Sequence, residues 1–398
     1  MMSDIQDKLS SLTPEEQRAL LLQKIKAERG VTTTDTPQTA SEKGMNFSLI
    51  FFSGDGGTES EHKYDLLLEC ARFADTHGFS AVITPERHFQ PVGGLFPNPS
   101  VLNAALAMIT KNIQLRAGSV VLPLHNPLRV AEEWSLVDNL SQGRAAISCA
   151  TGWHPADFLI NPEAYENRRA TMLENIALIR QLWRGESVQR QDIAGNTVEV
   201  NILPRPIQKE LPMFLTSSGN PDTWLKAGEL GMHVLCSLTN HTLAELKTNI
   251  TAYRDARAKH GYDPESGIVS VMVHTFVGEQ DDVVKNQVRE PLRDFLNGYI
   301  NQNDTLNPYK DRQQTVRSAI DNDREALLTY AFEKHFNQTS LMGSPEKCAR
   351  MVHKLQEAGA NEIACLVDFG LSMETVLAGL QPLLAALKAQ CAHKTVNG

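Results

Sequence analysis

The 398-residue chain lacks several features that would place it in a well-marked class. No stretch approaches the roughly 18 consecutive apolar residues that a membrane-spanning helix needs. Its net charge is −9, whereas binding to nucleic acid or to an anionic membrane needs a basic face, so we expect neither partner. The amino terminus is polar and acidic, unlike a secretory signal peptide, and we therefore expect a cytoplasmic protein.

The chain is also poor in the patterns of metal and nucleophile chemistry. Its six cysteines are scattered and include no C-x-x-C pair, which argues against a disulfide framework and a zinc site. No set of His, Asp and Glu has metal-ligand spacing, and no G-x-S-x-G nucleophile elbow is present. We therefore expect no metal ion and no serine hydrolase.

The first 44 residues are predicted to form a helix and a flexible linker outside the main domain. Thr13-Pro14-Glu15-Glu16 has the sequence of a capped helix start, and the helix is expected to run to about Glu28. Residues 30–44 are rich in Thr, Ser, Pro and Gly and have almost no apolar side chain. The helix either docks a partner protein or packs on its own domain or a dimer mate.

Residues 45–390 are predicted to form a single domain in which strands alternate with helices. Eight strands are expected, at Asn46–Phe52, Ser80–Thr84, Ile113–Leu122, Ala145–Ala150, Met213–Thr216, His233–Cys236, Val269–Phe276 and Glu362–Val367. Helical patterns lie between them, at Tyr64–Thr76, Asn98–Ile109, Tyr165–Trp183, Pro221–Leu230 and Leu243–His260. This alternation predicts the α/β class, and specifically a (β/α)8 TIM barrel.

Two insertions and a tail complete the predicted domain. Val188–Ile202 has the pattern of a hairpin, and a larger insert at about residues 278–340 is polar in its middle with helical flanks. Long insertions at the carboxyl edge of a barrel often act as lids. Residues 391–398 are expected to be a tail.

The segment Thr216–Asp222 carries the clearest ligand signal that the residues give by themselves. It follows the fifth strand and opens a helix at Asn220, which can cap that helix. The free N–H groups of the helix start, together with Gly219 and the hydroxyls of Ser217 and Ser218, would form an anion site. A phosphate is expected to bind there without an arginine.

Four motifs in order along the chain resemble the bacterial luciferase-like flavin monooxygenases. They are Ile83–Phe89, Ala117–His154, Leu215–Pro221 and Leu341–Glu346, and the resemblance covers Met45–Leu384. Two further pieces, Leu12–Leu22 and Glu362–Gly370, are similar to the subgroup associated with nonribosomal peptide and polyketide biosynthesis.

The resemblance implies a flavin site at the carboxyl ends of the third, fourth and fifth strands. Ser218 matches the phosphate-binding serine of the family, and Ser119-Val120 matches the place where the isoalloxazine lies against the backbone, often over a non-proline cis peptide. The other implied cofactor residues are Thr151, Gly152, Trp153, Tyr165, Arg168, Ser217, Gly219 and Asn220.

Glu86-Arg87-His88-Phe89 is the implied reaction centre. Relatives have acid-His-His-Phe here, and the first histidine, tied to catalysis in the family, is replaced by Arg87. Arg87 stays cationic and would stabilise a peroxy anion or an acidic substrate, while His88 would donate a proton. The alternative is that Glu86 and Arg87 form a salt bridge and His88 is a satisfied loop histidine.

The function implied by the resemblance is an FMN-dependent monooxygenase that works through a flavin C4a-hydroperoxide. A separate reductase would supply reduced FMN, because no second nucleotide-binding domain is evident. The substrate would be a natural-product intermediate, either a small molecule or tethered to a carrier protein that docks through residues 1–28, and the assembly a homodimer. Hydroxylation and Baeyer–Villiger insertion both stay open. The alternatives are an F420-dependent hydride-transfer oxidoreductase and a non-catalytic flavin-binding or interaction protein.

Overall fold

The structure is a computed structural model that describes residues 44–52, 62–240, 242–305 and 324–392. The chain divides into two units after Glu42, and the account below concerns the second. The predicted amino-terminal helix and linker therefore lie outside the described residues, as do residues 393–398 of the predicted tail. The last helix ends at Ala392, two residues inside the expected tail.

Eight parallel strands close into a barrel, which confirms the predicted (β/α)8 architecture. Around the barrel the order is β1, β2, β3, β4, β7, β8, β9 and β11, and β11 pairs with β1 to close it. Each predicted strand is present with its ends within two residues. The observed bounds are β1 Asn46–Ile50, β2 Ala81–Thr84, β3 Gln114–Val121, β4 Ala145–Ala150, β7 Met213–Ser217, β8 His233–Ser237, β9 Val269–Val277 and β11 Glu362–Leu366.

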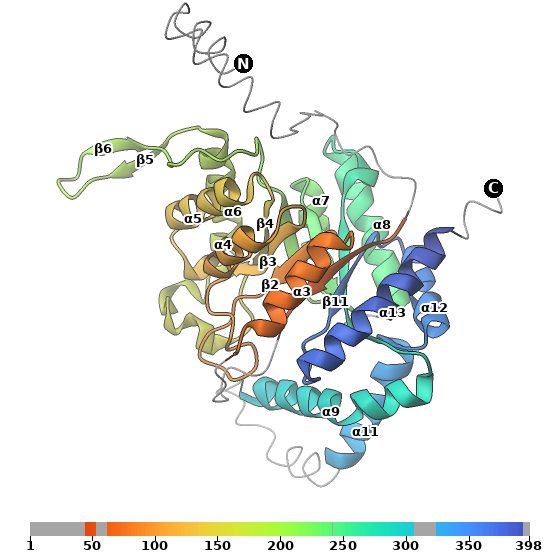
Figure 1. The fold of residues 1–398 in the computed structure, drawn as a ribbon. Helices are drawn as coiled ribbons and strands as arrows, with labels where there is room; N and C mark the ends of the chain where they lie inside the picture. The colour runs from red at the N-terminus through yellow and green to blue at the C-terminus, as the bar shows by residue number, and fades with distance from the viewer. Residues whose placement is uncertain (1–43, 53–61, 241, 306–323, 393–398) are drawn as a thin grey trace, which may run out of the picture. The chain divides into compact units, whose positions relative to one another are not determined.

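Helices follow the strands and surround the barrel (Figure 1). Three of them begin at an asparagine whose side chain accepts a backbone N–H bond, and a proline follows each asparagine. These caps are Asn98, Asn126 and Asn220. The helices are α3 Asp65–Thr76, α4 Pro99–Ile109, α5 Pro127–Ser141, α6 Arg168–Arg184, α7 Pro221–Glu229, α8 Leu243–Lys259, α12 Pro345–Glu357 and α13 Met373–Ala392.

The barrel interior is apolar near its middle and charged near the amino ends of the strands. Arg116 and Glu362 form an ion pair there, with Nη1 and Oε1 2.6 Å apart and both side chains 2% exposed. The Arg116 guanidinium also lies 3.9 Å above the centre of the Phe214 ring. Burial opposes ionisation of Glu362, but Arg116 outweighs it and holds the pKa of the Glu362 carboxyl below its usual value. This pair fills part of the barrel interior near the amino ends of the strands.

Both predicted insertions are present. The hairpin consists of β5 (Val188–Gln191) and β6 (Thr197–Val200). The larger insert contains α9 (Asp281–Thr305) and α11 (Arg324–Gln338), and its middle, residues 306–323, lies outside the described residues. A short strand that was not predicted, β10 (Leu341–Gly343), pairs with the end of β9. Across the described ranges, no helix is long and apolar enough to cross a membrane.

Candidate functional site

A cavity of about 370 Å³ opens at the carboxyl ends of the barrel strands. Residues from all eight barrel strands, or from the loops that follow them, line this central cavity, and the insert helices α9 and α11 contribute as well. Seven residues that the sequence predicted for the site line it: Glu86, Arg87, Ser119, Thr151, Gly152, Trp153 and Ser218. The ends of distant strands therefore meet where ligands bind in barrels of this kind.

A second cavity of about 390 Å³ adjoins the first, and we call it the basic cavity. The two cavities share Thr151, Thr216 and Ser218, so they are continuous. The basic cavity is also lined by the cations Arg168, Arg169 and Lys226, the carboxylate Glu166 and the helix cap Asn220.

Two arginines and a lysine beside a helix start make a strong site for a phosphate group. The sequence predicted a phosphate site here without an arginine, whereas the structure places two arginines on this cavity. Arg168 and Arg169 come from the start of α6, which packs beside the Ser218 loop only in the folded barrel.

The floor of the central cavity is the end of β3. The peptide bond between Gly118 and Ser119 is cis, one position before the Ser119-Val120 pair that the resemblance implied. A Cβ atom on Gly118 would lie 2.3 Å from Cγ2 of Ile83, so only glycine fits there. The Ser119 hydroxyl shares a 2.6 Å hydrogen bond with that of Thr216, which ties β3 to β7 across β4. Val120 is buried and does not line either cavity.

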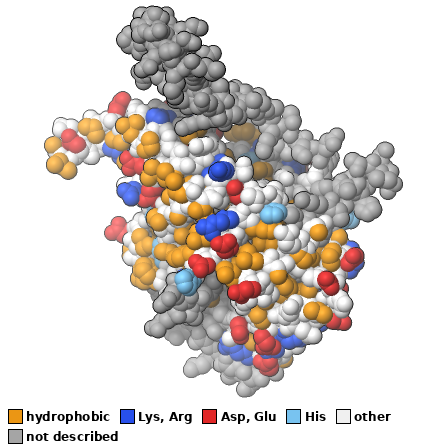
Figure 2. Space-filling view, in the orientation of Figure 1, with side chains coloured by type: hydrophobic (Ala, Val, Ile, Leu, Met, Phe, Trp, Pro, Cys, Tyr) orange, Lys and Arg blue, Asp and Glu red, His pale blue; other side chains and the backbone are white. Residues whose placement is uncertain are grey.

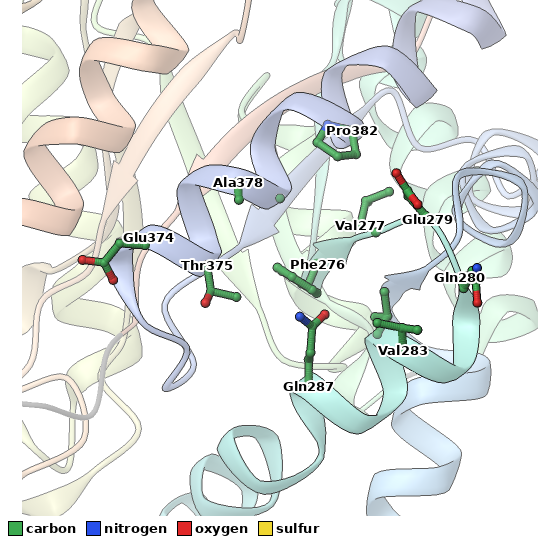
Figure 3. A pocket seen from close by; sticks show the side chains of 13 residues that line it. Phe276, Val277, Glu279, Gln280, Val283, Gln287, Glu374, Thr375, Ala378 and Pro382 are labelled. Carbon is green, nitrogen blue, oxygen red and sulfur yellow. The ribbon is translucent and has the colours of Figure 1, made fainter.

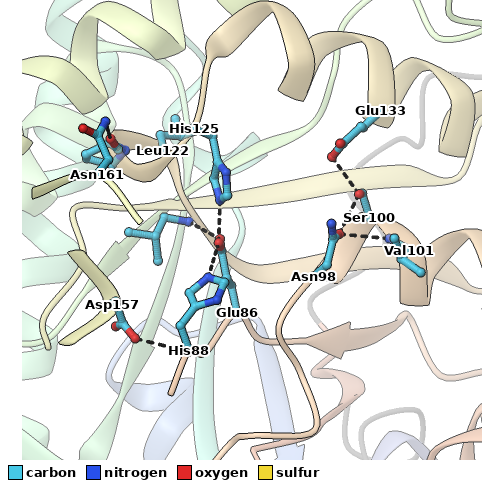
Figure 4. A network of polar contacts seen from close by, with 12 residues as sticks. Glu86, His88, Asn98, Ser100, Val101, Leu122, His125, Glu133, Asp157 and Asn161 are labelled. Atoms are coloured by element: carbon cyan, nitrogen blue, oxygen red, sulfur yellow. Dashed lines mark hydrogen bonds and ion pairs between the residues drawn. The ribbon is translucent and has the colours of Figure 1, made fainter. Parts of the chain in front are cut away.

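Glu86 is the centre of a buried hydrogen-bond network (Figure 4). Its Oε1 lies 2.9 Å from Nε2 of His88 and 2.5 Å from Nε2 of His125. Its Oε2 accepts the backbone N–H of Val121 at 2.7 Å. The backbone N–H of His88 donates to Oδ1 of Asp157 at 3.2 Å. The network thus joins the ends of β2 and β3 to the turn after β4.

The charges in this network depend on both burial and hydrogen bonding. Burial acts to raise the pKa of the Glu86 carboxyl, but the bonds from His125, His88 and Val121 outweigh it and lower that pKa below 4.5. Burial acts to lower the pKa of His125, but the hydrogen bond to Glu86 outweighs it and raises that pKa above 6.5. Glu86 is therefore ionised near neutral pH, and His125 keeps its proton more readily than a free histidine.

His88 lies behind Glu86 and does not line the central cavity. A role for His88 in proton transfer would therefore run through Glu86, rather than directly to a ligand as the sequence suggested. The ligand atoms of Glu86, His88 and His125 lie within 4.8 Å of one another, although no metal-ligand spacing marks them in the sequence. One carboxylate oxygen accepts from both imidazoles at hydrogen-bond distance, so we interpret the group as a hydrogen-bonded triad.

Arg87 is a buried cation on the wall of the central cavity. Its guanidinium lies between two aromatic rings, 4.6 Å from the centre of Phe52 and 4.4 Å from that of Trp153. A Cβ atom on Gly93 would lie 2.5 Å from its Cγ, so glycine is needed to leave room for the side chain. The salt bridge between Glu86 and Arg87, which was the alternative interpretation, does not occur between these described residues, because Glu86 bonds to the histidines.

The remaining predicted residues support the cavities from behind. Ser217 is buried, and its hydroxyl accepts the N–H of Gly219 at 3.4 Å. Tyr165 packs edge-to-face on Phe158, and the Arg168 guanidinium lies 4.4 Å above the Tyr165 ring. Neither Ser217, Gly219 nor Tyr165 lines either cavity.

Several residues that complete the site were not predicted from the sequence. Arg169 and Lys226 line the basic cavity, His125 bonds to Glu86, and His274 and His335 line the central cavity. Only His125 stood in a motif that the sequence marked. The others lie on helices or inside a strand, where a single polar residue gives no local sign of a ligand.

A further cavity of about 480 Å³ lies between α9 and α13 (Figure 3). It shares no lining residue with the central cavity, and its charged lining residues are Glu279 and Glu374. A phosphate would meet carboxylates and no cation there, so this cavity does not compete for the ligand of the basic cavity.

Comparisons with known proteins agree with this geometry. The model of the luciferase-like monooxygenase family matches residues 45–362. The oxygenase component of flavin-dependent trigonelline monooxygenase from Acinetobacter baylyi is 22% identical over 89% of this chain and 99% of its own length.

Two solved structures share the fold. The first is the oxygenating constituent of 3,6-diketocamphane monooxygenase from a Pseudomonas putida plasmid, in complex with FMN. It has a TM-score of 0.65 and 20% identity over 87% of this chain and 96% of its own. The second, an F420-dependent secondary alcohol dehydrogenase, has a TM-score of 0.63 and 17% identity over 86% and 99% of the two chains. Because the family model spans most of the chain, the protein belongs to the luciferase-like monooxygenase family and is an enzyme of that type.

Proposed function

We propose that this enzyme binds reduced FMN and uses molecular oxygen to oxygenate a small organic substrate. The observation that supports the proposal most strongly is the continuity of the two cavities. The basic cavity, which is lined by cations, adjoins the central cavity, whose floor is the Gly118–Ser119 backbone. The names of the trigonelline and diketocamphane enzymes, which include flavin or FMN, support the same choice.

The residues fit FMN part by part. Ser218, Asn220, Arg168, Arg169 and Lys226 would hold the phosphate, since they line the basic cavity. The ring system would lie over the β3 end in the central cavity, whose walls include both aromatic and polar side chains. Bound reduced flavin supplies the electrons that activate oxygen.

The chain's own residues then have distinct tasks. Trp153 and Phe52 shield Arg87 from water, which strengthens its attraction for any negative charge that develops in the cavity. Glu86 fixes the position of the strand end through Val121, and its hydrogen bond favours the protonated form of His125. The His125–Glu86 pair can therefore hold one proton next to the cavity wall.

The cofactor can be tested by titration of the full-length protein with FMN, riboflavin and F420, monitored by flavin fluorescence and native mass spectrometry. FMN is expected to bind, and riboflavin at least ~10-fold more weakly, because it lacks the phosphate that the cations would hold. Equal binding of riboflavin and FMN would contradict the assignment of the basic cavity. The F420-dependent dehydrogenase shares the fold, so tight binding of F420 with no oxygen uptake would support hydride transfer instead.

We further propose that reduced FMN comes from a separate reductase and that the substrate is an intermediate of peptide or polyketide biosynthesis, free or tethered to a carrier protein. The resemblance to the biosynthetic subgroup supports both proposals. One of its two motifs, Glu362–Gly370, nevertheless contains residues with a structural role in the barrel. Glu362 pairs with Arg116, and Asp368 accepts the N–H of Phe52 at 2.8 Å. The substrate class therefore depends mainly on Leu12–Leu22, outside the described residues.

Incorporation of ¹⁸O from labelled oxygen into free and carrier-bound substrates, with an added flavin reductase, would test this class. Deletion of residues 1–44 should impair only the carrier-bound reaction. Oxygen consumption that no substrate changes would support the non-catalytic alternative.

We also propose a homodimer. The neighbouring helices α4 and α5 expose large apolar side chains, namely Val101, Met108, Leu136 and Leu140. Figure 2 shows hydrophobic side chains, in orange, across the face on which these helices lie. Several large exposed apolar side chains on two neighbouring helices are typical of an interface.

A further inference from the structure

The wall of the central cavity opposite the proposed cofactor site contains a pair of histidines. His274 lies on β9 and His335 on α11, and both line the cavity. Around the closed barrel, β9 is four strands from β3 in either direction, so it is directly across from the Gly118–Ser119 floor. A substrate that faces the flavin ring over β3 would therefore contact the β9 wall.

The two imidazoles are joined into a chain that ends in an unused nitrogen. Nε2 of His335 lies 2.8 Å from Nδ1 of His274, and Nδ1 of His335 lies 3.1 Å from the hydroxyl of Thr339. The second ring nitrogen of His274, Nε2, is buried and has no hydrogen-bond partner among the residues that the structure describes. The rings of Phe295 and Phe369 lie edge-to-face around it and offer no oxygen or nitrogen. Buried polar atoms are nearly always satisfied, so this atom points to a missing partner.

Both imidazoles are neutral, which limits the kind of chemical group that can be the missing hydrogen-bond partner of His274. Burial, and then the neighbouring His335, hold the pKa of His274 well below its ordinary value. Burial lowers the pKa of His335 to about 4. A neutral imidazole donates from one nitrogen and accepts at the other, and the Thr339 hydroxyl is compatible with either arrangement of the chain. The surrounding wall, Met272, Phe295 and Leu296, is apolar.

We propose that Nε2 of His274 hydrogen-bonds a carbonyl or hydroxyl group of an otherwise apolar part of the substrate. His335 is a positioning residue, because its bond to Nδ1 fixes the ring of His274 and decides which nitrogen bears the proton. A carbonyl would select the tautomer with the proton on Nε2, and a hydroxyl suits both. A carboxylate would find no cation at this wall, since neither imidazole is charged. The inference rests on the proposed function only in calling this ligand a substrate.

Four cyclohexane probes that differ in one substituent test the inference: cyclohexanone, cyclohexanol, methylcyclohexane and cyclohexanecarboxylate. Binding to the full-length protein, with and without FMN, is measured by saturation-transfer difference NMR. The ketone and the alcohol should bind at least ~10-fold more tightly than the hydrocarbon, the scale of one hydrogen bond. The carboxylate can bind to Arg87 or in the basic cavity, so it is the probe whose affinity should not change when His274 is replaced. Equal binding of ketone and hydrocarbon would overturn the inference.

Variants assign the effect to His274. His274→Phe should reduce ketone affinity at least ~10-fold, while His274→Gln, which keeps a hydrogen-bonding group, should stay within about threefold. His353→Phe, on an exposed position of α12, is the control and should have no effect. Unchanged ketone binding in His274→Phe would refute the role. If that variant does not fold, the four probes on the unmodified protein still decide. The probe series measured without flavin tests the role of His274 independently of the cofactor. Failure of the unmodified protein to bind FMN would instead refute the proposed function.

Discussion

Replacing Glu86 with glutamine should destabilise the protein in a pH-dependent way. The substitution keeps the shape and an oxygen that can accept the Val121 N–H, but it removes the charge that His125 and His88 contact at 2.5 and 2.9 Å. Hydrogen bonds to a charged group contribute about 1.5–3 kcal/mol each, and solvent weakens the one to His125, whose side chain is 32% exposed. We expect a loss of about 3 kcal/mol at pH 6.

The pH dependence follows from the directions of the two pKa shifts. Because folding lowers the pKa of Glu86, its contribution is present above its ordinary pKa of 4.5 and is lost as the pH falls through the folded value. Because folding raises the pKa of His125, its contribution is present below 6.5 and is lost as the pH rises through the folded value. The pair therefore stabilises most between pH 4.5 and 6.5, and the cost of Glu86→Gln should fall to about 1–2 kcal/mol at pH 9.

Urea unfolding followed by tryptophan fluorescence at pH 6 and pH 9 would measure this difference. Glu362→Gln is the matched control, because it removes a buried carboxylate whose partner, Arg116, does not titrate in this range. We expect it to cost about 3–5 kcal/mol at both pH values, the usual penalty for leaving a buried charge unpaired. If Glu86→Gln also costs the same at pH 6 and pH 9, His125 is not protonated in the pair and the reasoning fails.

Four further outcomes are expected. Ser218→Ala should weaken FMN binding by about 1–2 kcal/mol, and Ser218→Asp by more through repulsion; an aspartate variant with unchanged affinity would move the phosphate elsewhere. Arg169→Ala should weaken FMN binding at least ~10-fold but leave riboflavin binding unchanged in the same fluorescence titration. His88→Ala should keep FMN affinity within about 1 kcal/mol while ~10²-fold more oxygen is diverted to hydrogen peroxide. Peroxide release and turnover equal to those of the unmodified enzyme would show that His88 has only a structural role. Met108→Glu should convert a dimer to a monomer in mass photometry, whereas Ile193→Glu, at a more exposed position after β5 of the hairpin, should not.

The sequence by itself determined the architecture and the loops that form the site. Period-2 apolar runs, proline-capped helix starts and short polar loops are local signals, and every predicted strand was confirmed. The loop around Ser218 and the segment from Thr151 to Trp153 line the cavities for the same reason, because in a barrel the carboxyl ends of all strands meet at one edge.

The tertiary structure alone decided which side chains meet within that edge. The bond between His335 and His274 joins positions 61 residues apart, and Arg169 and Lys226 line the basic cavity from two different helices. The sequence predicted His88 at the reaction centre. In the structure the His88 side chain bonds to Glu86 instead, and Arg87 lines the cavity wall. Local patterns specify where a strand ends, whereas the direction of a side chain beyond that end depends on the partners that the fold brings to it.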